Sequence, residues 1–191
     1  MTKARDLANG GFGLVLIKPS SVVNGTDNGK GTVTFSAAST VSLNGVFNST
    51  YDNYRVVFQI PTSSSAGYLL AQFCTGNSAN STSNYNNATW AFRSGNAQQV
   101  ETANENDSQT NLLTTLGNGA GASLDIINPF SSSYNTMMHG TAYYVSGSTG
   151  SKILATIHGT RFQTNTSFDG IKFNLGSNTQ IGTVSVYGYN K

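Results

Sequence analysis

Charge and cysteine are both scarce in this chain of 191 residues. Charged residues make up 9% of it, against roughly 25% in an average domain, and the ten lysines and arginines are scattered. A nucleic-acid-binding surface concentrates its basic residues on one face, so we expect no nucleic-acid partner. The single cysteine, Cys74, excludes an intrachain disulfide, and the apolar run around it indicates a buried strand.

Long apolar runs are also missing. No stretch approaches the ~20 apolar residues of a membrane-spanning helix, so we expect no membrane insertion. The basic residues near the start are not followed by the apolar segment of a signal peptide. With the lack of disulfides, this predicts synthesis in a reducing compartment. Aromatic residues nevertheless reach 10%, which argues against disorder and leaves Asn, Ser, Thr and Gly to cover the surface.

Short strands separated by turns dominate the rest of the sequence. In residues 41–58, apolar and polar residues alternate, Asn44-Gly45 makes a turn, and a run of aromatic and β-branched residues follows. About ten such strands, with no amphipathic helix beyond the first residues, predict an all-β fold. We expect a single antiparallel, jelly-roll-like β-sandwich over residues 13–191. Residues 76–87 are expected on the surface, and residues 95–110 as a long loop or sheet edge.

Residues 1–12 are predicted to form an N-terminal anchoring arm. Residues 2–9 have the composition for about two helical turns, and Gly10 follows as a stop signal. A helix this short is marginal in isolation, so the arm needs a partner surface. Its contact residues are expected to be Arg5, Leu7, Phe12 and Leu14.

Residues for catalysis or metal binding are few. His139 and His158 lie in neighbouring predicted strands and could be close in space, but the sequence offers no further ligands beside them. Asp125 is the only acid in the middle of a predicted strand, and it is expected to point outward. A glycosidase needs two facing carboxylates, and we find no such pair. We therefore expect no enzymatic activity, no metal and no cofactor.

Aromatic residues among amide side chains offer one possible binding function. Tyr85 lies within the polar stretch 84–87, and Trp90 is the only tryptophan of the chain. Aromatic rings combine an apolar face with, in these residue types, a hydrogen-bonding group. Tyr85 and Trp90 are therefore the candidate contacts for a carbohydrate, if the chain binds one.

Five segments, in this order, carry a further signal: residues 13–19, 41–58, 124–130, 168–171 and 184–189. Together they resemble a β-sandwich domain of tailed-bacteriophage virion proteins, found in small tail-fibre, appendage and capsid-decoration proteins, especially of marine and cyanobacterial phages. Residues 3–9 are also similar to short segments of phage tail and fibre proteins. The resemblance implies a non-enzymatic building block that is often trimeric and exposed on the virion.

The expected function is therefore that of a virion structural protein. The chain has no long fibre shaft and its arm starts at Met1, which favours a small subunit anchored through its N-terminus to capsid or tail proteins. The expected location is the virion, after synthesis in the host cytoplasm, and the expected oligomer is a homotrimer. The alternative is a receptor-binding adhesin that recognises host surface carbohydrate through Tyr85 or Trp90.

Overall fold

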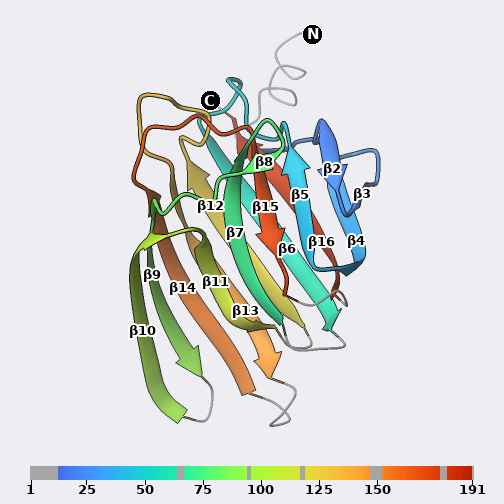
Figure 1. Cartoon of the computed structure of the whole chain (residues 1–191). Helices are drawn as coiled ribbons and strands as arrows, with labels where there is room; N and C mark the ends of the chain where they lie inside the picture. Colours follow the sequence, from blue (N-terminus) through green and yellow to red (C-terminus); the bar gives the residue numbers. More distant parts are fainter. Residues whose placement is uncertain are drawn as a thin grey trace, which may run out of the picture.

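Two antiparallel sheets pack face to face in this protein (Figure 1). The computed structural model describes residues 13–63, 67–93, 96–116, 119–146, 152–176 and 180–190. Within these ranges every regular element is a strand. The predicted all-β sandwich is thus confirmed. The predicted arm, residues 1–12, lies outside the described residues.

The larger sheet has ten strands. In spatial order they are β10 (Asn96–Asp107), β9 (Tyr85–Arg93), β14 (Lys152–Phe162), β13 (Met137–Ser146), β12 (Ala120–Ile127), β6 (Asn53–Ser63), β16 (Gln180–Tyr189), β4 (Thr32–Ala38) and β3 (Thr26–Asp27), with β1 (Leu14–Leu16) also paired to β16. The smaller sheet has six strands: β11 (Thr110–Leu116), β7 (Gly67–Thr75), β15 (Gly170–Asn174), β5 (Thr40–Asn44) and β2 (Ser21–Val23), with β8 (Ser78–Ala79) beside β7.

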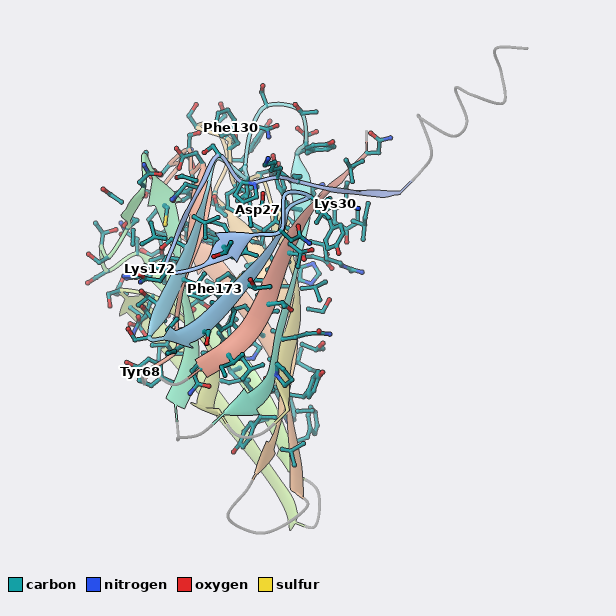
Figure 2. All side chains as sticks on the ribbon, turned by 90° about the vertical axis from the view of Figure 1, so that its right-hand side faces the viewer. Asp27, Lys30, Tyr68, Phe130, Lys172 and Phe173 are labelled. Carbon is teal, nitrogen blue, oxygen red and sulfur yellow. The ribbon has the colours of Figure 1, made fainter. Side chains whose placement is uncertain are left out.

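The core lies between the layers and follows the period-two pattern of strands. In β6, for example, the inward side chains of Val56, Phe58 and Ile60 are buried. Phe58 meets Phe173 of the opposite sheet with ring centroids 4.9 Å apart. Phe173 lies between the layers, whereas Lys172 and Tyr68 lie on the outer side of the smaller sheet (Figure 2). Cys74 is buried, as predicted, and burial raises the pKa of its thiol to about 12.

Two polar stretches that the composition placed in loops or at the surface contain β-strands. Residues 95–110, expected as a loop or edge, form the edge strand β10 and the start of β11. An edge strand has a hydrogen-bonded neighbour on one side only, so the outer edge of its backbone stays open to water. In the expected surface segment 76–87, residues 76–84 are exposed or half-buried as predicted, whereas Tyr85 and Asn87 are buried at the start of β9. That strand continues into the apolar run with Trp90, and its inner face helps to close the core.

Candidate functional site

Arg55, Asp125 and Tyr189 form a connected polar cluster on the outer face of the larger sheet. The guanidinium of Arg55 donates two hydrogen bonds to the Asp125 carboxylate, with Nε–Oδ1 2.9 Å and Nη2–Oδ2 2.7 Å. The Tyr189 hydroxyl donates to the same carboxylate, and its ring centroid lies 5.8 Å from the guanidinium carbon. Burial alone would raise the pKa of Asp125, but the bonds from Arg55 and Tyr189 outweigh it and lower the pKa.

This cluster joins three of the five segments that carry the sequence resemblance, namely 41–58, 124–130 and 184–189. The fourth, 168–171, joins them through the backbone, since Phe168 N donates to Pro129 O (2.7 Å) and Phe47 N donates to Asp169 O (3.1 Å). The segments are distant in sequence but adjacent in the folded chain. Asp125 points outward as predicted, but its carboxylate is already bound, so the cluster fastens the fold rather than offering a free acid.

Asp125→Asn is therefore expected to lower the free energy of unfolding by about 1–2 kcal/mol, because it removes a charge-assisted, bidentate pair. Arg55 is 38% exposed, so solvent screening keeps the effect modest. Urea unfolding of Asp125→Asn, Arg55→Met and the double variant measures it. The double variant should lose less than the sum of the two single losses. Strict additivity would contradict direct coupling between the two side chains.

The two histidines do not form a site. His139 pairs with Gly159, and His158 pairs with Gly140, on adjacent strands. Successive side chains of a strand point to opposite faces, so His139 lies exposed on the outer face and His158 is buried between the sheets. The expectation that they might come together is wrong for this reason. Among the described residues, no group of three His, Cys, Asp or Glu side chains is placed to hold a metal ion.

The prediction that Tyr85 is a surface residue is wrong. Its side chain is fully buried, with ring centroids 4.9 Å from Phe162 and 6.0 Å from Phe73. The hydroxyl accepts from Phe73 N (2.9 Å) and donates to Asn80 O (3.1 Å). Tyr85 is therefore a core residue whose polar end is satisfied by backbone groups, and its ring is not available to a carbohydrate at the surface.

Trp90, by contrast, is 40% exposed on the outer face of β9. Its ring lies nearly parallel to that of Phe92, with 9° between the planes and 6.0 Å between the centroids. Beside it is a shallow hollow of about 620 Å³. The lining residues are Ala88, Thr89, Trp90, Ala103, Ile157, His158 and Gly159. Of the two proposed carbohydrate contacts, only Trp90 reaches the surface.

Of the four predicted arm contacts, Leu14 alone belongs to the described residues. It lies in β1, where it pairs with Tyr189 at the end of β16. Leu14 and Val15 are each 41% exposed. Arg5, Leu7 and Phe12 lie outside the described residues. No helix in the described part of the chain is long and apolar enough to cross a membrane.

Comparison with known proteins leaves the family open. No protein-family model and no curated protein matches the chain. Among solved structures, the chain is similar to the enzymatically active domain of tailspike protein 2 from bacteriophage CBA120, at a TM-score of 0.34 and 14% sequence identity. The match covers 94% of this chain and 28% of that one. A phage tailspike domain is thus a weak structural neighbour, and at this level the likeness carries no functional argument.

Proposed function

We propose that the chain is a non-enzymatic structural subunit of a bacteriophage virion, anchored to capsid or tail proteins through its arm, residues 1–12. The proposal is supported by the five phage-like segments, three of which meet at the cluster of Arg55, Asp125 and Tyr189 while a fourth is joined to them by backbone hydrogen bonds. Sequence motifs that are far apart in the chain but adjacent in the folded structure are typical of proteins that share a fold. Capsid decoration and a tail appendage both fit this description.

The observation that carries the proposal is the position of β1. The arm precedes this strand, which pairs with β16 at the rim of the larger sheet. The exposed side chains of Leu14 and Val15 border the point where the arm joins the body. Burying the remaining apolar surface of such side chains contributes roughly 1 kcal/mol each. A stable attachment therefore needs the arm itself, in which Leu7 and Phe12 are the apolar residues of the predicted contact set.

Deletion of residues 1–11 tests the anchoring role. We expect the truncated chain to fold with an unchanged thermal midpoint, because the core formed by the described residues starts at Ile17, but to lose incorporation into particles by at least tenfold. The measurement is the amount of protein that co-purifies with assembled particles. Leu7→Ser with Phe12→Ser in the full chain is the matched variant, since it keeps the arm length and removes its apolar contacts.

Unimpaired incorporation of the truncated chain would refute anchoring by the arm.

The same samples test the proposed homotrimer, because sedimentation measures their mass in solution. A monomeric full chain at micromolar concentration would contradict self-assembly before attachment to the particle. The adhesin alternative depends on Trp90 and its surroundings.

A further inference from the structure

The outer face of β10, β9 and β14 carries a trough of small residues. Ala103 pairs with Ala88, and Ala88 pairs with Gly159, so these three residues form one row across three strands. A Cβ added to Gly159 would meet nothing within 4 Å, which shows that the space above this row is open. Strands lie about 4.8 Å apart, so the row spans about 10 Å.

The first long side of the trough presents two apolar side chains, in a row where Glu101 of β10 also pairs with Trp90. The next row on the same face contains Trp90 paired with Ile157. Both side chains are exposed, Trp90 by 40% and Ile157 by 54%. Behind them, Phe92 lies nearly parallel to the indole ring. An aromatic ring and an aliphatic side chain together provide a firm surface for the apolar face of a ligand.

The opposite long side can form hydrogen bonds. It consists of Asn86 and Arg161, which pair with each other on β9 and β14. Both side chains are held in place: Arg161 Nε donates to Asn135 Oδ1 (3.1 Å), and Asn86 Oδ1 accepts from Asn106 N (3.2 Å) and from Gln163. His139, which pairs with Gly159 on β13, closes the end of the row and is exposed.

We propose that this trough is a carbohydrate-binding site. A pyranose ring has an apolar face of C–H groups and a rim of hydroxyls, and the trough presents matching surfaces: Trp90 and Ile157 on one side, Arg161 and Asn86 on the other. The volume of about 620 Å³ lies within the range of small-ligand sites, about 300–1,000 Å³. None of the residues that line the site belongs to the arm, so the carbohydrate proposal is tested separately from the proposed anchoring.

The test uses the single tryptophan of the chain, because its fluorescence reports on this site alone. The full chain is titrated with a panel of gluco-, galacto- and manno-configured tetrasaccharides and their uronic acids. We expect at least one of these to change the Trp90 emission saturably, and calorimetry to give the same dissociation constant. Gly159→Leu is expected to weaken binding at least tenfold, because it fills the trough while leaving Trp90 in place.

Two further variants complete the test by calorimetry. Trp90→Ala is expected to weaken binding at least tenfold, whereas Tyr134→Ala, which removes an aromatic ring that is 66% exposed in a loop, should leave it unchanged. Absence of saturable binding across the panel would overturn the proposal. A second result would also overturn it: a sedimentation coefficient that rises with protein concentration in the wild type but not in Gly159→Leu. The trough would then be a contact between copies of the chain.

Discussion

Tyr85→Ala is expected to lower the free energy of unfolding by about 4 kcal/mol, the largest loss predicted for this protein. The substitution removes a fully buried ring and leaves a cavity beside Phe73 and Phe162, and Phe-to-Ala changes in cores cost about 3–5 kcal/mol. It also leaves Phe73 N and Asn80 O without the hydroxyl that now binds both. A domain at the lower end of the typical stability of about 5–15 kcal/mol would then be close to unfolding.

Tyr85→Phe separates the two contributions, because it keeps the ring and removes only the hydroxyl. We expect it to cost about 1–2 kcal/mol, the usual penalty for a buried donor left without its partner. Urea unfolding of both variants measures the free energies. The exposed-ring control is Tyr134→Ala, which should stay within about 0.5 kcal/mol of the wild type. Wild-type stability in Tyr85→Ala would place this ring outside the core and restore it as a surface contact.

Stability is expected to fall by about 3 kcal/mol between pH 6.5 and pH 4 because of His158. This side chain is 3% exposed, and burial lowers its pKa from 6.5 to about 4. Its ring nitrogens lie 3.0 Å from Thr89 Oγ1 and 2.6 Å from Thr156 Oγ1. The unfolded chain takes up a proton as the pH falls through 6.5, whereas the folded chain stays neutral until about pH 4. Each unit of difference is worth about 1.4 kcal/mol.

The measurement is the free energy of unfolding at half-unit steps from pH 7.5 to pH 4. His158→Gln should lose stability at neutral pH, where its contacts with Thr89 and Thr156 are altered, but its curve should lack the decline that His158 causes. His139→Gln is the matched control on the outer face and should keep that decline. A wild-type curve parallel to that of His158→Gln over this range would mean that the folded chain protonates this histidine as readily as the unfolded one.

The sandwich could be predicted from sequence because alternation and turn residues are local signals. Residues 41–58 contain both, and they form β5, a turn at Gly45 and β6. The position of Tyr85 could not be read in the same way, because its neighbours Asn84, Asn86 and Asn87 are polar. Asn87 is nevertheless buried, and its amide donates to Gln109 O (2.9 Å) while its Oδ1 accepts from Thr160. A polar residue satisfied inside the sandwich is indistinguishable from a loop residue by composition alone.

The trough beside Trp90 depends on strand register, which the sequence does not reveal directly. Ala88, Ala103 and Gly159 are unremarkable small residues until three strands align them in one row. The same applies to the two histidines, whose strands were correctly expected to pair. A one-residue offset in that pairing decides which face each side chain occupies. The candidate aromatic residue was visible in the sequence, but the surface around it was not.

The short strand β1 is also the first strand of the described structure that a pulling force on the preceding residues would meet. Its three residues pair with β16, and its flanks add bonds from Ile17 N to Val186 O (2.9 Å) and from Asn190 N to Gly13 O (3.2 Å). Tension applied ahead of Gly13 reaches these few bonds before it reaches the core. If β1 detached from β16, the segment ahead of the sandwich would become longer while the two sheets stay packed. A subunit under tension would therefore lose the pairing of β1 first.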